Sequence, residues 1–408
     1  MTTEILLVIL LIGTIIVAAL LVKSGLDSIG LPSLVGYLAL GFLIRLVDTQ
    51  RGLLSGEAQK TFELLSDIGI ICLLFEVGLK SNLPGLIRQL RQASIIWISN
   101  VLVSGFLGYI ASYIILNLSW IQSLFISVAL TATSVGVSVV LWREANVLSS
   151  PDGELVIDVA ELDDLSGIFL MAMLFAAAPV LREGIGTHLL PGLARTSGIL
   201  IVKMVIFAAL CLLFSRYLEH PITAFFQKIE PPPDSMLMVA GIGFIMAALA
   251  GLLGFSLAIG AFFAGLIFSR DPEAVKMEAS FTPLYEFFTP FFFIGVGLQV
   301  DPHTLSTALG LGAVLLTVAI AGKLIGTYLP AVPAVGWKSA LLVGISMIPR
   351  AEIAMIIIRK GSMLGEWAVP PHVFSAMVFV SFLTCIISPL ALRPGLRLWP
   401  QKEVQETG

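Results

Sequence analysis

The chain has 408 residues, of which 57% are hydrophobic and only 12% are charged, and its mean hydropathy is +1.00. Because soluble domains average about 25% charged residues, this composition excludes a soluble globular protein and indicates a membrane protein with many spans. The net charge of -4 comes without a basic stripe or tail, so no nucleic-acid partner is expected. Three cysteines without CxxC spacing are predicted to be small core residues: Cys72, Cys211 and Cys385.

Apolar stretches long enough to cross a hydrocarbon core of about 30 Å recur along the whole chain. They predict an all-α polytopic membrane protein with about thirteen transmembrane helices. The approximate spans are 4–23, 29–47, 63–80, 93–117, 122–143, 155–180, 195–215, 235–254, 255–269, 282–299, 307–331, 338–359 and 371–393. Since the first stretch lacks a basic start and a small-residue cleavage site, we expect it to be retained as a helix.

The distribution of Lys and Arg predicts the orientation in the membrane. With thirteen spans the termini lie on opposite sides, and one set of connecting segments holds about twice as many Lys and Arg residues as the other. The positive-inside rule therefore predicts an N terminus outside and a cytoplasmic C terminus.

Two pairs of segments repeat within the chain. The stretch "GLPSLVGYLALGFLI" (30–44) resembles "GFSLAIGAFFAGLIF" (254–268), and the tripeptide VGL occurs at 77–79 and at 296–298. The period is seven spans, so the second copy is inverted, and we predict two six-helix units of inverted topology joined by a linking helix. Similar glycine spacing also arises by chance in apolar helices, where small residues allow close packing.

The predicted helices 122–143 and 338–359 each contain a polar interruption at corresponding places in the two halves. These are "TATSVG" (131–136) and "GISMIPRAE" (344–352). Pro349 cannot donate a helical hydrogen bond, and Thr and Ser side chains can satisfy the freed backbone groups. The pattern favours a pair of crossed broken helices, and an ordinary kink in each helix is the alternative.

Asp163 and Asp164 lie close to the bilayer centre in "AELDDLSGIFLMAML" (160–174). An ionised carboxylate there costs several kcal/mol unless something pairs with it. Adjacent helical residues point about 100° apart, so we expect one aspartate to coordinate a cation while the other pairs. Glu161 lies one turn nearer the cytoplasm and belongs either to an acidic funnel or to a solvated helix end.

Carboxylate, hydroxyl and carbonyl oxygens are the ligands that hard cations such as Na⁺ prefer. Burial and a like-charged neighbour raise the proton affinity of a carboxylate, whereas a bound cation lowers it. One site can therefore hold either a proton or a cation, and this competition is what an antiporter requires.

Lys323, in "AIAGKLIGTYL", is the predicted partner of the aspartates, because a buried lysine needs a carboxylate or loses its proton. Snorkelling to the interface is the alternative for this lysine. Arg350 and Glu352 flank Ala351 in the second break, where they either neutralise each other or hold neighbouring helices.

At these residues the chain resembles the sodium/proton antiporters of the cation/proton antiporter superfamily, specifically the NapA type. The matching segments follow the family's order and cover nearly the whole chain: "LPSLVGYLALG", "LLFEVGL", "TATSVGVSVVL", "NVLSSP", "LDDLSG", "GKLIG", "MIPRAEIAMII" and "SPLALRP". The combination of a Thr/Ser break, paired aspartates, a lysine and Pro-Arg-x-Glu is highly specific.

The resemblance implies a set of functional residues. Asp163 and Asp164 form the site for the transported cation and for protons, and Lys323 pairs with one of them. Thr131 and Thr133 belong to the unwound helix, and these two residues and Lys323 are also expected to take part in ion and proton binding. Supporting positions are Ser134, Glu161, Pro349, Arg350 and Glu352. Two adjacent aspartates match the electrogenic branch, which moves more protons than cations.

The resemblance also implies a domain organisation and a homodimer in a prokaryotic inner membrane. Residues 1–85 and 226–304 are predicted to form a dimerisation domain, residues 86–185 and 305–408 a core domain, and residues 186–225 a linker. Close packing of the Gly-rich helices 29–47 and 255–269 is expected to help dimerisation. The end at Gly408, without a nucleotide-binding domain, disfavours the potassium-efflux type.

Other functions stay open at this stage. They are a K⁺/H⁺ antiporter or a channel of the same fold, and a sodium-coupled symporter for an organic anion, which needs no membrane-embedded lysine. An enzyme is not expected, because no GxGD, no HExxH and no nucleophile with a base occurs. No cofactor is expected beyond the transported ions, and the sequence does not separate Na⁺ from Li⁺ or K⁺.

Overall fold

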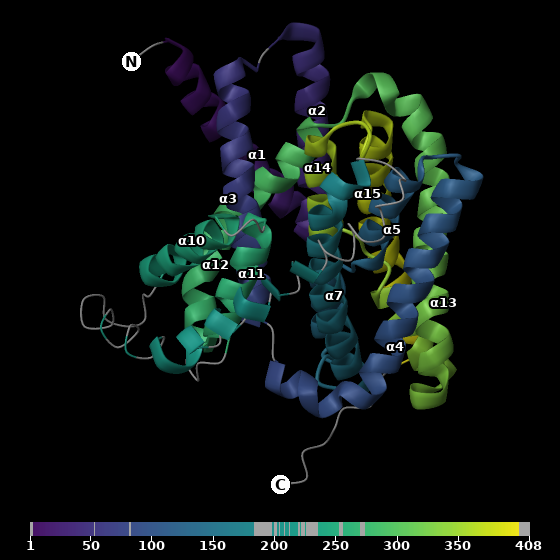
Figure 1. The fold of residues 1–408 in the computed structure, drawn as a ribbon. Coiled ribbons are helices and arrows are strands. Elements are labelled where there is room, and N and C mark those ends of the chain that lie inside the picture. Colours follow the sequence, from purple (N-terminus) through teal and green to yellow (C-terminus); the bar gives the residue numbers. More distant parts are fainter. Residues whose placement is uncertain are drawn as a thin grey trace. The chain divides into compact units, whose positions relative to one another are not determined.

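The computed structural model shows an all-helical protein (Figure 1). It describes residues 3–52, 54–80, 83–182, 198–199, 202–203, 205–207, 209–211, 213–218, 221, 225, 236–252, 256–269 and 274–399. Every regular element in these ranges is a helix, and they contain no strand. The predicted all-α fold class is therefore confirmed.

The helices of the first half follow the predicted spans in order. They are α1 (Thr3–Ile29), α2 (Ser33–Arg51), α3 (Gly56–Lys80), α4 (Leu83–Ile110), η1 (Ala111–Ile115), α5 (Trp120–Thr131), α6 (Val135–Glu144) and α7 (Pro151–Arg182). The start of α5 has a clear local cause, because the side chains of Ser119 and Gln122 each accept a hydrogen bond from the backbone amide of the other.

In the second half, the described residues of the predicted span 195–215 are helical, and η2 (Phe214–Leu218) begins at its end. The next elements are α10 (Met236–Leu252), α11 (Leu257–Phe268), α12 (Ala274–Leu298), η3 (Pro302–Thr304), α13 (Leu305–Ser346), α14 (Glu352–Leu364) and α15 (Pro371–Leu398). Most of the predicted linker 186–225 and residues 400–408 lie outside the described residues.

Two predicted spans meet inside α13. The helix runs over 42 residues but contains Gly336 with φ 78° and ψ 164°, which are not helical values. Glycine takes a positive φ at little cost, so the chain can turn sharply here. The predicted spans 307–331 and 338–359 thus join at this kink. Among the described residues, seven helical segments are long and apolar enough to cross a membrane, with α10 and α11 as shorter apolar helices.

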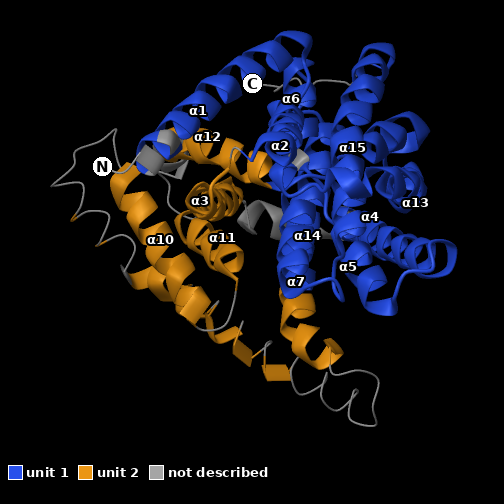
Figure 2. Cartoon of the chain, turned by 90° about the horizontal axis from the view of Figure 1, so that it is seen from above, with its two compact units in different colours: residues 1–53, 85–171, 296–408 blue, residues 54–84, 172–295 orange. Residues whose placement is uncertain are grey.

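The chain forms two compact units (Figure 2). Unit 1 comprises residues 1–53, 85–171 and 296–408, and unit 2 comprises residues 54–84 and 172–295. Both broken helices and all the predicted site residues belong to unit 1. The division into dimerisation and core domains stays a prediction.

The sequence repeat has a counterpart in the packing of α3 on α11 within unit 2. A Cβ at Gly78 would lie only 2.2 Å from the carbonyl oxygen of Phe262 and 3.0 Å from the Cα of Gly265. Only glycine fits at this contact, because the two helix backbones touch there.

The same contact recurs where the end of α12 meets α2 within unit 1. A Cβ at Gly297 would lie 2.3 Å from the carbonyl oxygen of Leu38 and 3.0 Å from the Cα of Gly41. Gly78 and Gly297 are the central residues of the two VGL tripeptides, and Gly41 and Gly265 were matched in the other repeated segment. Matched residues therefore make matched contacts, which confirms the internal repeat.

Other glycines of α2 and α11 also pack inside one chain. Gly36 lies against Val22 and Leu26 of α1, and Gly260 lies against Ala247 of α10. The close approach that these glycines allow is used within the protomer. The packing therefore gives no support to the idea that they form a dimer contact.

Replacing Gly78 or Gly297 by alanine should destabilise the protein by about 1–3 kcal/mol each, because each added Cβ overlaps a backbone oxygen. Gly13→Ala is the matched control, since no atom lies within 4 Å of its added Cβ. Thermal unfolding in detergent measures the effect. Equal melting temperatures for Gly78→Ala and Gly13→Ala would contradict the role of this contact.

Candidate functional site

The two broken helices meet at their interruptions. In the first break, between α5 and α6, Ala132 and Ser134 have extended backbone angles. The second break separates α13 from α14, and its Pro349 carbonyl accepts a 2.9 Å hydrogen bond from the backbone amide of Ser134. The hydroxyl of Thr133 also lies 3.4 Å from the carbonyl oxygen of Met347. The predicted crossing of two broken helices is confirmed.

Side chains of α6 hold the end of α13. The Ser138 hydroxyl donates a 2.6 Å hydrogen bond to the carbonyl of Ser346, and the Trp142 indole donates to the hydroxyl of Ser346 at 2.9 Å. All three residues are buried. The α5 and α14 half-helices also lie side by side (Figure 1). Backbone groups freed by the breaks therefore find partners within the crossing itself.

Charged side chains lie at the ends of the half-helices. The Lys323 ammonium donates to the carbonyl of Thr131, the last residue of α5, at 2.6 Å. The Arg350 guanidinium donates to the carbonyl of Met347, just after α13, at 3.1 Å. Because the carboxyl end of a helix carries partial negative charge and orphan carbonyls, a cation is stabilising at each place.

Glu352 complements the opposite helix ends. It lies in the first turn of α14, and its Oε1 is 4.0 Å from the Cβ position of Gly136 in the first turn of α6. Amino ends of helices carry partial positive charge, which favours a carboxylate there. Arg350 and Glu352 form no ion pair with each other in the described part of the chain. The Arg350 side chain instead donates to the carbonyls of Met347 and Pro349 in its own break, and its supporting role stays a prediction.

The side-chain contacts of Asp163 are all made through one of its two oxygens. Its Oδ2 accepts hydrogen bonds from Lys323 Nζ at 2.5 Å, Thr133 Oγ1 at 2.6 Å and Asn100 Nδ2 at 2.8 Å. Asp163, Lys323 and Asn100 are 0% exposed. The other oxygen of Asp163, Oδ1, is buried and has no hydrogen-bond partner among the described residues.

Asp164 differs from its neighbour. It is half-buried, and it makes no hydrogen bond or ion pair with any residue that the structure describes. The charged side chains close enough to act on it electrostatically are Glu352, Asp163, Glu161 and Lys323. Asp163 thus pairs with a lysine, whereas Asp164 has no such partner among the described residues.

The remaining predicted site residues contribute through their backbone or from a distance. Thr131 uses its carbonyl for Lys323, while its hydroxyl bonds to the carbonyl of Val128 in its own helix. Glu161 lies half-buried on α7, one turn before Asp164. The ion-binding role expected for Thr131 and the supporting role expected for Glu161 both stay predictions.

The sequence reasoning missed Asn100. This residue lies in the middle of α4, within the predicted apolar span 93–117, and its side chain reaches Asp163. A single amide in the centre of an apolar span was the available signal, because a polar group there needs a partner. Trp97 of the same helix donates a 3.0 Å hydrogen bond to Ser166 on α7, which ties the two helices together.

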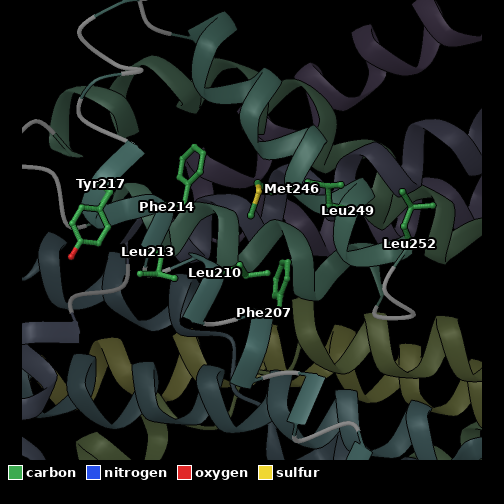
Figure 3. A pocket seen from close by; sticks show the side chains of 8 residues that line it. All are labelled: Phe207, Leu210, Leu213, Phe214, Tyr217, Met246, Leu249 and Leu252. Carbon is green, nitrogen blue, oxygen red and sulfur yellow. The ribbon is translucent and has the colours of Figure 1, made fainter.

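A separate apolar pocket of about 550 Å³ lies in unit 2 (Figure 3). Its lining has no charged side chain and consists of Phe207, Leu210, Leu213, Phe214, Tyr217, Met246, Leu249 and Leu252. A dehydrated cation would find no carboxylate there, so this pocket is not a candidate ion site.

Crossed discontinuous helices with charged groups at their ends are the arrangement of ion-coupled secondary transporters. The family model "Sodium/hydrogen exchanger, transmembrane" matches residues 11–398. The chain belongs to this family of multi-pass membrane transporters, which exchange monovalent cations for protons and are not enzymes.

Two curated relatives and one solved structure illustrate which proteins this chain is similar to. The chain is 30% identical over 343 residues to the high-affinity Na⁺/H⁺ antiporter NhaS3 of Synechocystis sp., covering 82% of this chain and 71% of that one. It is 26% identical over 370 residues to the Na⁺/H⁺-K⁺ antiporter GerN of Bacillus cereus, covering 90% of each. The structure of the sodium proton antiporter MjNhaP1 from Methanocaldococcus jannaschii has the same fold, with a TM-score of 0.67 at 14% identity over 97% of this chain and 99% of that one.

Arg350→Gln should lower thermal stability by about 1–3 kcal/mol, because the buried carbonyl of Met347 loses its charged donor. The control is Arg45→Gln, which removes a partly exposed arginine paired with Asp48 and should cost little. Melting temperatures in detergent report both effects. A wild-type melting temperature for Arg350→Gln would show that the guanidinium does not hold the break.

Proposed function

We propose that the protein is an electrogenic antiporter that exchanges Na⁺ for protons by alternating access. The observation that carries this proposal is the buried pair of Lys323 and Asp163 at 2.5 Å beside an aspartate, Asp164, without such a partner. If the pair of Lys323 and Asp163 were only structural, the carboxylate of Asp164 would add nothing but a cost, because an unpaired charge near the membrane centre is unfavourable.

The proposed exchange runs through competition for the two carboxylates. In the cation-free state Lys323 carries a proton and pairs with Asp163, while Asp164 holds a second proton. An arriving cation takes the position between the carboxylates, Asp164 gives up its proton, and the weakened attraction for Asp163 lets the buried lysine lose its own. Two protons then leave for one monovalent cation, so each cycle moves net charge.

The crossing supports alternating access around this site. Lys323 bonds both Asp163 and the end of α5, so a change in its pairing also changes how that half-helix is held. In the proposed cycle the core domain, residues 86–185 and 305–408, moves against residues 1–85 and 226–304 of a homodimer. The N terminus lies outside and the C terminus in the cytoplasm, as the Lys and Arg distribution favours.

Na⁺ is the first choice of cation, and K⁺ is the alternative. The name of NhaS3 specifies sodium, whereas that of GerN includes potassium. Proton movement in vesicles on adding Na⁺, Li⁺ or K⁺ separates them. A symporter for organic anions is disfavoured by the lysine held against Asp163, which such a mechanism does not need.

Asp164→Asn should abolish cation-driven proton movement while leaving the melting temperature near that of the wild type, because Asp164 pairs with no described residue. Asp163→Asn should abolish exchange and also lower stability, since it leaves Lys323 buried without its counter-ion. Glu154→Gln, at an exposed position of the same helix, is the control. Proton flux in vesicles is the measurement, and full exchange in both aspartate variants would remove the core of the proposal.

Lys323→Gln should shrink the transport current toward electroneutrality, because one fewer proton would be exchanged per cation. A purely structural salt bridge predicts a different result, namely a lower melting temperature with unchanged charge per cycle. Current on a solid-supported membrane, recorded together with the melting temperature, distinguishes the two. An undiminished current with normal proton coupling would mean that Lys323 carries no transported proton.

A further inference from the structure

Asn100 lies beside Asp163 and has no role in the proposed exchange. Its side chain is fully buried, and its Nδ2 donates a 2.8 Å hydrogen bond to Oδ2 of Asp163. It comes from α4, a helix that contributes no other side-chain hydrogen bond to Asp163. A buried amide costs free energy when one of its polar atoms is left without a partner.

Close packing of α4 on α13 brings this short side chain within reach. A Cβ at Gly326 would lie 2.8 Å from the Cα of Asn100, and one at Gly322 would lie 3.0 Å from the Cα of Ser104. Two glycines one turn apart thus let the backbones approach, which small residues commonly do in membrane helices. Gly322 and Gly326 lie one residue before and three residues after Lys323, so the helices approach each other near the ion pair.

Two oxygens at this place have no partner. Oδ1 of Asn100 and Oδ1 of Asp163 are both buried and accept no hydrogen bond from any described residue. Since the amide nitrogen donates to Oδ2 of Asp163, the amide oxygen remains available to another ligand. Buried acceptors without a donor are rare, and each calls for an explanation such as an ion. Carboxylate and amide carbonyl oxygens are ligands of hard cations.

We propose that Asn100 is a direct ligand of the transported monovalent cation, which it binds through its amide oxygen alongside Asp163 and Asp164. This inference rests on the proposed cation/proton exchange. The amide adds an oxygen ligand without adding negative charge, so it strengthens binding of the dehydrated cation while leaving the charge of the site to the two aspartates.

A competing role is that Asn100 only orients Asp163 through its nitrogen. Two substitutions separate these roles. Asn100→Leu removes both the nitrogen donor and the oxygen ligand, whereas Asn100→Asp removes the donor and keeps oxygen ligands. Lys323 and Arg350 both lie close enough to act on Asp163, so an added carboxylate there has cations nearby.

The experiment measures cation binding directly, through the rise in melting temperature of purified protein with increasing NaCl at constant ionic strength, balanced with choline chloride. We expect Asn100→Leu to raise the apparent dissociation constant about tenfold or more, a loss typical of one good ligand. Asn100→Asp should bind Na⁺ at least as tightly as the wild type. Leu102→Ala, at an exposed position of the same helix, is the control and should leave binding unchanged.

The outcomes are distinguishable. The ligand role is overturned if Asn100→Leu binds Na⁺ as tightly as the wild type, or if Asn100→Leu and Asn100→Asp weaken binding equally. The exchange proposal still stands in either case, provided that Asp164→Asn abolishes the rise in melting temperature with NaCl. A wild-type protein that no cation stabilises overturns both proposals. If Asn100→Leu does not yield a monodisperse protein, Asn100→Ala replaces it. The Na⁺ affinity of Asn100→Ala is then compared with that of Asn100→Asp by the same criterion.

Discussion

A helix that stops inside a membrane leaves backbone groups that water cannot reach, and this constraint organises the whole candidate site. The two breaks solve it jointly, because the amide of Ser134 bonds to the carbonyl of Pro349 and side chains of α6 bond to Ser346. Charged groups complete the arrangement, with Lys323 at the end of α5 and Arg350 at the end of α13. The crossing and the charges are therefore parts of one structure.

The Lys323 ammonium connects the end of a broken helix with the carboxylate of the candidate site. It bonds the last carbonyl of α5 and the carboxylate of Asp163 at the same time. A lysine that serves both partners makes the state of the aspartate and the state of the half-helix depend on each other. In the proposed exchange, this shared contact would let ion binding at Asp163 change how the α5 half-helix is held.

Packing through glycine explains why the helices can lie so close. Gly78 and Gly297 bring equivalent helix pairs into backbone contact, and Gly322 and Gly326 do so for α4 and α13. Without water or a hydrophobic driving force, helices in a membrane associate through close contact and polar bonds. Glycine contacts of this kind thus hold the repeated helix pairs together and also bring the amide of Asn100 next to the pair of Lys323 and Asp163.

The sequence alone determined the all-helical membrane fold, the repeat, both breaks and the three central charges, because hydropathy, proline and isolated charges act locally along the chain. Only the tertiary structure decided that Lys323 pairs with Asp163 and not with Asp164, that Thr131 serves through its carbonyl, and that Asn100 belongs to the site. These choices depend on the rotation of each helix and on the distance between helices. Both are set by contacts between residues far apart in the chain, which no local pattern records.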